Sequence, residues 1–397
     1  SIMENGTDRE SALKILNNFI DNKLHNYANK RNIDYGPGNH ENISLLSPYI
    51  RNRIITEQEV INSVIEKFPL SRVEKFIQEI FWRTYWKGWL EHRPEVYDDY
   101  LSDRDILLNK FANKKFYQNA IKANTNYNFF NKWVLDLKNK GYLHNHIRMW
   151  FASIWIFNLN LPWQLGADFF MQHLLDGDPA SNTLSWRWVS GIQTKGKNYI
   201  ARKSNIEKYS NIKLNENEIL NENVYPIQDD RLYNIKEINI NHEINTDNIK
   251  AIIVPTDEIN IVKDLNIQNC NSFYGLPLND YNDHKFDIKI INHIKKITLS
   301  HLNDDIFYQT SNYELHFDNY YDELNKWINN KKINEIYLPY VTKGNWKNIY
   351  KKIINNNPSV NFIVFNRNYD AKSWIYSKKG FFNFKKNIQK IIAEIIQ

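Results

Sequence analysis

The chain is poor in cysteine and glycine, and each shortage excludes a kind of site. Its 397 residues include one cysteine, Cys270. A single cysteine excludes an intrachain disulfide, an iron–sulfur cluster held by cysteines, and a zinc site built from several cysteines. We therefore expect a reducing, cytoplasmic location. After residue 205 the only glycines are Gly275, Gly344 and Gly380, so this part has no glycine-rich loop of the kind that cradles phosphates.

Long apolar runs are also missing. The best candidate, 149–163, is interrupted by Asn158 and Asn160, and it is shorter than the roughly 20 residues that a membrane-spanning helix needs. The first residues show no basic stretch followed by an apolar one, so we expect no secretory signal. From these two observations we expect no membrane contact.

The length and periodicity of the chain predict two domains. A chain of 397 residues exceeds the size at which a single core usually stops growing. Between residues 8 and 205, apolar residues recur at intervals of three and four, which predicts a helical domain. The segment 206–248 is rich in Asn, Glu and Ile, and we interpret it as a linker or a long surface excursion. The formal net charge of +6 is compatible with a polyanionic partner.

After residue 248 the pattern changes. Short β-type runs alternate with helical stretches, which predicts a smaller α/β domain over 249–397 with a parallel, Rossmann-like sheet. The predicted strands are 251–255, 297–301, 335–340 and 361–366. The predicted helices are 320–331, 345–355 and 383–396.

The most informative segment is 176–188. It combines two acids, an amide and two indoles, namely Asp176, Asp178, Asn182, Trp186 and Trp188. Its Gly-Asp-Pro sequence is compatible with a simple turn. However, two carboxylates in so apolar a stretch require a cation or hydrogen-bond donors if they are buried. Arg148, in the preceding predicted helix, is the nearest candidate for that partner.

A second motif is centred on Glu79. On a helix, Glu79, Trp82 and Arg83 share a face, because they are three and four residues apart. A carboxylate beside an indole suits a pocket that hydrogen-bonds a planar base and stacks on it. The alternative is a surface ion pair between Glu79 and Arg83, and this motif alone favours that alternative.

Two further motifs are weaker. His144 and His146 point to different sides of a helix, so we expect no shared metal ion. Asn145 and Met149 share one face, which by itself indicates packing rather than function.

The segment 44–48 predicts a helix start, with Ser47 as the cap and Pro48 as the first helical residue. The hydroxyls of Ser44 and Ser47 and the free amides around Leu46 would form an anion site. The alternative, favoured for this motif alone, is that Ser47 merely caps the helix.

Taken together and in this order, these motifs resemble the photolyase/cryptochrome superfamily, and specifically the helical flavin-binding domain of photolyases that repair cyclobutane pyrimidine dimers. The resemblance covers residues 8–205, about half the chain, and implies FAD as the cofactor. The residues that it assigns to FAD are Tyr27, Arg31, Ser44, Leu46, Ser47, Arg148, Asp176, Asp178 and Asn182. Asn182 corresponds to the residue that faces flavin N5, where an amide suits the reduced flavin that repair requires.

The resemblance also implies a pocket for a lesion flipped out of the DNA. This pocket consists of Glu79, Trp82, Asn145, Met149 and Trp188. The two indoles would pack on the pyrimidines, and the acid and the amide would hydrogen-bond their polar edges. The implied reaction is a light-driven electron transfer that opens the cyclobutane ring.

A basic segment is implied to contact DNA phosphates, which would make binding fall with salt. Its residues are Lys195, Lys197, Arg202 and Lys203. For each residue taken singly, a solvated basic loop is an equally good interpretation.

The implied electron relay is incomplete. Trp186 and Trp163 correspond to its first two indoles. The third position falls near residues 110–111, where there is no tryptophan, so Phe116, Tyr117 or another tryptophan would have to serve as the alternative end.

Other departures from the family pattern indicate a divergent branch. His146 stands where dimer-repairing enzymes often carry arginine. Asn131 replaces an expected acid, and 203–205 replaces an aromatic-Asn-Pro run. The family's antenna domain precedes the helical part, whereas here an α/β segment follows it, so we expect that antenna domain to be absent.

The function expected from this resemblance is that of a deoxyribodipyrimidine photolyase, a carbon–carbon lyase that acts on UV-damaged DNA as a monomer without a metal ion. The alternatives are a cryptochrome-like blue-light receptor, a photolyase for (6-4) photoproducts, and a DNA-binding protein that keeps FAD as structure only. The intact dimer-shaped pocket favours repair over signalling. Asn145 disfavours (6-4) repair, which relies on a histidine pair in the pocket.

Overall fold

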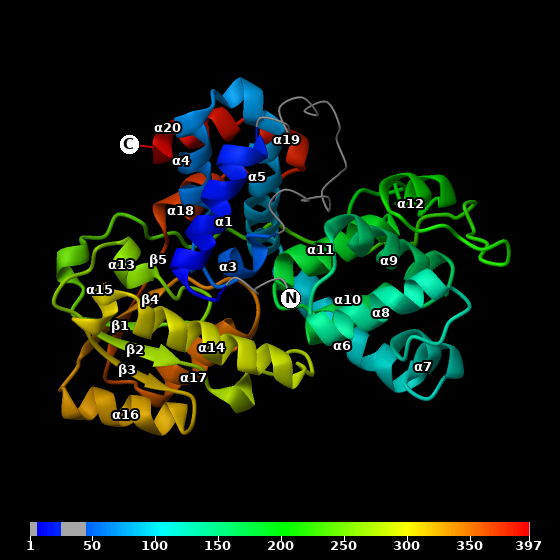
Figure 1. The fold of residues 1–397 in the computed structure, drawn as a ribbon. Helices are drawn as coiled ribbons and strands as arrows, with labels where there is room; N and C mark the ends of the chain where they lie inside the picture. The colour runs from blue at the N-terminus through cyan, green and yellow to red at the C-terminus, as the bar shows by residue number, and fades with distance from the viewer. Residues whose placement is uncertain (1–5, 25–44, 397) are drawn as a thin grey trace. The chain divides into compact units, whose positions relative to one another are not determined.

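The computed structural model describes residues 6–24 and 45–396 (Figure 1). Contacts within the chain divide these residues into two compact units. The first unit is 93–234, and the second combines 6–24, 45–92 and 235–396. These units cut the chain differently from the predicted domains 8–205 and 249–397, because the first helices pack with the α/β part. In the described ranges, no helix is both long and apolar enough to cross a bilayer.

The first unit is built from helices with a core of aromatic residues. Trp133, Trp150 and Trp155 are among its fully buried side chains. Two helices end at glycines in the left-handed conformation, Gly141 and Gly191, because a residue without Cβ turns there at little cost. The helices are α6 (Glu95–Phe111), α7 (Lys115–Ile121), α8 (Asn128–Lys140), α9 (Asn145–Phe157), α10 (Trp163–His173), α11 (Pro179–Ser190) and α12 (Lys203–Tyr209).

The segment 211–234 has no helix or strand among its described residues, yet it is held to the helices of its unit. Ile219 O accepts a hydrogen bond from Tyr127 Oη at 2.8 Å. The backbone N–H of Ile227 donates to Ser190 O at 2.9 Å. This segment therefore packs as a surface excursion along the first unit.

The second unit begins with helices α1 (Arg9–Asn22), α3 (Ser47–Arg51), α4 (Glu57–Lys67) and α5 (Leu70–His92). The apolar face predicted for α5 is buried: Phe76, Ile77, Ile80 and Phe81 are all inaccessible to solvent. A capping box of Thr56 and Glu59 starts α4.

Two C-terminal helices pack on α5, namely α18 (Asn368–Trp374) and α19 (Phe381–Lys385), and α20 (Ile388–Ile395) packs on α18. The approach is close at Gly88, where a Cβ would lie 2.3 Å from Ser377 Oγ and 2.7 Å from Trp374 Cδ1. Because these distances are too short for real contacts, a side chain at residue 88 would push the C-terminal segment away from α5.

The α/β part contains five parallel strands in the order β3-β2-β1-β4-β5, which confirms the predicted parallel sheet. Strand-to-strand connections of this kind require crossover segments, and most of them here are helical. The strands are β1 (Ala251–Val254), β2 (Asn271–Gly275), β3 (Asn312–His316), β4 (Glu335–Pro339) and β5 (Asn361–Phe365). The helices among them are α13 (Ile261–Asp264), α14 (Ile288–Asp304), α15 (Ile306–Gln309), α16 (Tyr320–Asn330) and α17 (Asn345–Asn356).

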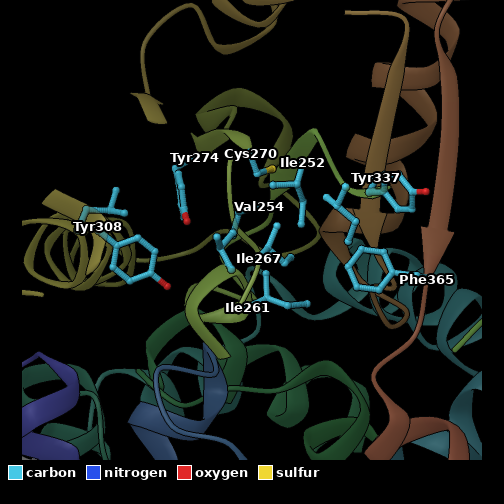
Figure 2. Close-up of a cluster of buried hydrophobic side chains, with 12 residues drawn as sticks. Ile252, Val254, Ile261, Ile267, Cys270, Tyr274, Tyr308, Tyr337 and Phe365 are labelled. Carbon is cyan, nitrogen blue, oxygen red and sulfur yellow. The ribbon is translucent and has the colours of Figure 1, made fainter. Parts of the chain in front are cut away.

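Helices cover both faces of this sheet, as the side chains that alternate between the two faces along β2 show. Phe273 packs on Trp327 of α16, whereas the next residue, Tyr274, packs on Tyr308 of α15. Figure 2 shows the core on the Tyr274 face, where Ile252 and Val254 lie among aromatic rings from β2, β4 and β5.

The predictions about the α/β part differ from the structure in three respects. The predicted strand 297–301 lies inside α14, whose buried residues Ile290, Ile294, Ile297 and His301 recur at intervals of three and four. Strands β2 and β3 were not predicted. Neither has a run of β-branched residues, and all of β3 remains at least partly exposed. The predicted helix 383–396 is divided between α19 and α20.

Candidate functional site

The expected ion pair between α9 and the segment before α11 is present. Arg148 Nη2 lies 2.9 Å from Asp176 Oδ2, and Arg148 Nε donates to Leu143 O at 2.7 Å. The Tyr142 ring packs against the same guanidinium. The second carboxylate oxygen, Asp176 Oδ1, is buried and has no hydrogen-bond partner in the described part of the chain. One acceptor is therefore left over for a donor from outside the described residues.

Asp178 and Asn182 are fixed by the start of α11. Asp178 caps this helix, accepting the backbone N–H of Ser181 at 2.8 Å. Asn182 Nδ2 donates to Ala167 O of α10 at 2.9 Å, which leaves its amide oxygen as an acceptor.

Two other buried oxygens near this helix start, Ser181 Oγ and Thr183 Oγ1, have no hydrogen-bond partner among the described residues. Buried polar atoms are normally hydrogen-bonded, so several partnerless ones in one short stretch leave hydrogen bonds for a polar ligand or water to make. Asp176 Oδ1 belongs to the same stretch, 176–183. A flavin dinucleotide, which has many hydrogen-bonding groups, fits this set of residues.

The aromatic neighbours of Trp186 lie mainly on α9 and α10. Its ring centroid is 6.3 Å from that of Trp155, and Trp155 is 6.3 Å from Tyr117. A Cβ at Gly166 would lie 2.3 Å from Trp186 and 3.0 Å from Trp155, so a glycine is required where the two indoles meet. Trp163, the predicted second indole, stacks on Tyr100 at 5.5 Å.

From the sequence, Tyr117 is expected only as one alternative end of the relay, and Trp155 is not singled out. Gly166 could have indicated this contact from the sequence. It lies in a helix interior, where glycine is unfavourable unless something packs against it. Burial raises the pKa of Tyr117 to about 12, and the nearby Asp168 carboxylate adds to the effect.

The predicted lesion residues fall in both units, and we describe each set by itself. In the first unit, Asn145 is the first residue of α9 and Met149 lies one turn later, and both are buried. Trp188 is partly exposed and packs at 5.9 Å on Tyr199.

In the second unit, Glu79 and Trp82 lie on α5 and are partly exposed. Arg83 Nε lies 3.7 Å from Glu57 Oε1 of α4.

The predicted anion site is only partly described. Tyr27, Arg31 and Ser44 lie outside the described residues. The prediction that Ser47 caps its helix is wrong: Leu46 is the capping residue and no side chain caps α3. Ser47 already has helical backbone, whereas a side-chain cap usually requires an extended residue before the helix.

The four predicted phosphate-contacting residues are all exposed. Lys195 and Lys197 lie in the turns after α11, and Arg202 and Lys203 begin α12. In the described part of the chain, no group of three or more histidine, cysteine or acidic side chains is placed to hold a metal ion.

The usual ligand site of a parallel sheet is filled by the chain itself. Such ligands bind at the carboxyl ends of the strands where the strand order reverses, here between β1 and β4. Arg51, Asn52 and Arg53 occupy this place. Asn52 Nδ2 donates to Thr256 O at 2.7 Å, and Arg53 Nη1 donates to Glu258 at 3.0 Å. A cavity of about 20 Å³ remains, which is far too small for a nucleotide.

The comparison with known families decides the identity of the helical region. A family model described as the FAD binding domain of DNA photolyase matches residues 76–217. Residues 76–217 therefore belong to the FAD-binding domain family of DNA photolyase. The match runs from within α5 through α12 and includes the Arg148–Asp176 pair.

Among curated photolyases, the deoxyribodipyrimidine photo-lyase of Buchnera aphidicola subsp. Baizongia pistaciae is 29% identical over 179 residues, which are 43% of this chain and 37% of that protein. The enzyme of the same name from Agrobacterium fabrum is 30% identical over 183 residues, covering 45% of this chain and 37% of that one. A bacterial class III photolyase from Agrobacterium tumefaciens matches in structure with a TM-score of 0.42 and 27% identity, over 51% of this chain and 43% of its own. The chain thus spans less than half the length of each of these photolyases.

Proposed function

We propose that the chain binds FAD and repairs cyclobutane pyrimidine dimers in UV-damaged DNA with light. Membership of the photolyase family through a FAD-binding domain supports the cofactor. The observation that best supports it in this chain is that three buried oxygens of the stretch 176–183, one of them on the Asp176 that pairs with Arg148, have no hydrogen-bond partner among the described residues. Bound FAD would supply light absorption and the transferred electron.

Each residue around the cofactor has a proposed task. Arg148 holds Asp176 in place, so that Asp176 Oδ1 can accept an N–H from the ligand. Asn182 presents an amide oxygen, because its nitrogen is engaged by Ala167 O, and this oxygen would accept the N–H of a reduced flavin. By resemblance, Asp178 lies near the ring and ribityl chain. Also by resemblance, Tyr27, Arg31, Ser44, Leu46 and Ser47 complete the FAD site.

The proposed lesion pocket contains residues that stack on the dimer and residues that hydrogen-bond it. Trp82 and Trp188 would pack on the two pyrimidines, and Met149 would supply an apolar wall. Glu79 and Asn145 would hydrogen-bond the polar edges and stabilise the transient negative charge on the dimer. Flipping a dimer out of the DNA helix costs little free energy, because the dimer already stacks and pairs badly.

The names of the relatives favour repair as well, since the matched curated proteins are called deoxyribodipyrimidine photo-lyases. The exposed residues Lys195, Lys197, Arg202 and Lys203 would contact phosphates. For the relay, we propose Trp186 as the first member. It continues either through Trp163, by resemblance, or through Trp155 and Tyr117, which lie in a row of ring contacts from Trp186.

The test is the loss of dimers from a UV-irradiated oligonucleotide, with the protein in blue light and in darkness. Loss of dimers only in blue light supports repair. A protein that binds FAD and responds to light without removing dimers would be a cryptochrome-like receptor. Binding to dimers without turnover in light would leave FAD a structural role. Either result would refute the proposed function.

A further inference from the structure

The indole of Trp82 on α5 contacts an aromatic ring from the C-terminal segment. The ring of Phe381, the first residue of α19, stacks on it with the ring centroids 3.5 Å apart and an angle of 16° between the planes. Both side chains are partly exposed. Two aromatic rings rarely approach more closely, so one face of this indole is covered by the protein's own side chain.

The segment that carries Phe381 is firmly attached to α5. Tyr85 Oη donates to Lys379 O at 2.7 Å, just before α19. Phe384 is completely buried, with its ring 5.8 Å from Phe81 and 5.5 Å from Tyr85. A helix held in this way behaves as a fixed part of the unit, not as a flap that swings away when a ligand arrives.

We propose that Phe381 is a positioning residue of the lesion pocket: it holds the Trp82 indole by stacking on one face, so that the exposed part of the indole is fixed for contact with a pyrimidine. This inference rests on the proposed function. An indole on a helix surface has several rotamers, and fixing one of them before binding lowers the entropy that binding costs. The stack thereby gives the C-terminal segment a part in substrate binding, although it lies outside the matched residues 76–217.

The chain offers a matched control. Phe382 is the next residue of the same short helix, but it is 72% exposed, and among the described residues only the Lys386 amino group lies over its ring. Phe382→Ala therefore removes the same side chain from the same helix without touching Trp82.

The experiment measures binding in the dark of a labelled oligonucleotide containing one thymine dimer, and of the undamaged oligonucleotide, by fluorescence anisotropy. We expect Phe381→Ala to weaken dimer binding by about 2- to 10-fold, the range that the energy of an aromatic pair corresponds to, with undamaged DNA bound as before. Phe381→Tyr should restore dimer binding, and Phe382→Ala should leave it unchanged. Phe381→Leu keeps apolar bulk for folding but loses the flat ring, so it should also bind the dimer more weakly.

Several results would overturn the inference. Dimer binding that is unchanged or tighter in Phe381→Ala would show that Phe381 is irrelevant or competes with the pyrimidine for Trp82. Equal weakening for dimer and undamaged DNA would show a merely structural role. If the unaltered protein has no preference for the dimer, the proposed function itself fails, and this outcome is distinct because it appears before any substitution.

Discussion

The buried charge cluster around Arg53 allows a quantitative prediction. Its guanidinium is 6% exposed and contacts carboxylates from three different elements: Asp370 at 2.7 Å, Glu258 at 3.0 Å and Glu57 at 3.2 Å. Arg53→Met keeps an unbranched side chain of similar length but removes the cation. Removing one partner of a buried ion pair costs about 3–5 kcal/mol, because the remaining charge is left uncompensated. For a unit of this size, such a loss lowers the Tm by about 6–20 °C.

The pH dependence of the loss follows from the same contacts. Burial by itself would raise the pKa of Glu57, but Arg53, Lys87 and Arg83 outweigh it and lower that pKa below its usual value. In the native protein this contribution is therefore present above the unfolded pKa of glutamate and is lost only as the pH falls through the lower folded pKa. Without Arg53, burial prevails and the folded pKa rises. The folded variant then binds more protons than the folded unaltered protein. Its loss of unfolding free energy relative to the unaltered protein should therefore be smaller at pH 5 than at pH 8.

The assay is differential scanning calorimetry of the full chain at both pH values. Arg231→Met is the matched control, because Arg231 also contacts several carboxylates, those of Asp99, Asp103 and Asp229, but is 40% exposed. Exposed ion pairs contribute about 0–1 kcal/mol. An Arg53→Met deficit no larger than that of the control, or one that does not change with pH, would refute the electrostatic reasoning.

The remaining predictions concern the proposed chemistry. Trp186→Phe should block photoreduction of bound FAD but spare repair by chemically reduced protein, and normal photoreduction would show that Trp186 is not in the relay. Glu79→Ala should lower the number of dimers split per absorbed photon while FAD stays bound, and an unchanged yield would count against its role. Replacing Lys195 and Lys197 by alanine should weaken binding to any DNA sequence and reduce the slope of log K against log salt by about 2, and an unaltered slope would mean that these exposed lysines do not contact phosphates.

The pairing within the candidate site could be predicted from sequence because it follows a simple rule. Two carboxylates in an apolar stretch need a buried cation or hydrogen-bond donors, and Arg148 was the nearest cation in the preceding predicted helix. The strands β1, β4 and β5 were predictable for a similar reason, since each is an apolar run with turn residues around it. Strand β3 was not, because a partly exposed strand of Asn312, Tyr313 and Glu314 has the composition of a loop.

Contacts between segments far apart in the chain could not be predicted from the sequence. Nothing in the residues around Trp82 indicates that Phe381 will stack on it, because that contact depends on how α18 and α19 dock on α5. The same holds for Arg53. A sequence shows one more arginine near a helix start, and only the folded chain brings Asp370 and Glu258 to it.

The proposed function depends first on the binding of FAD, which a titration of the purified protein with FAD measures. We expect saturable binding with a yellow product and quenched flavin fluorescence. Asp176→Asn removes the carboxylate charge that pairs with Arg148 and should weaken this binding, whereas the exposed Asp105 can be changed to Asn without effect. A protein that stays colourless at saturating FAD would show that the chain does not bind this cofactor.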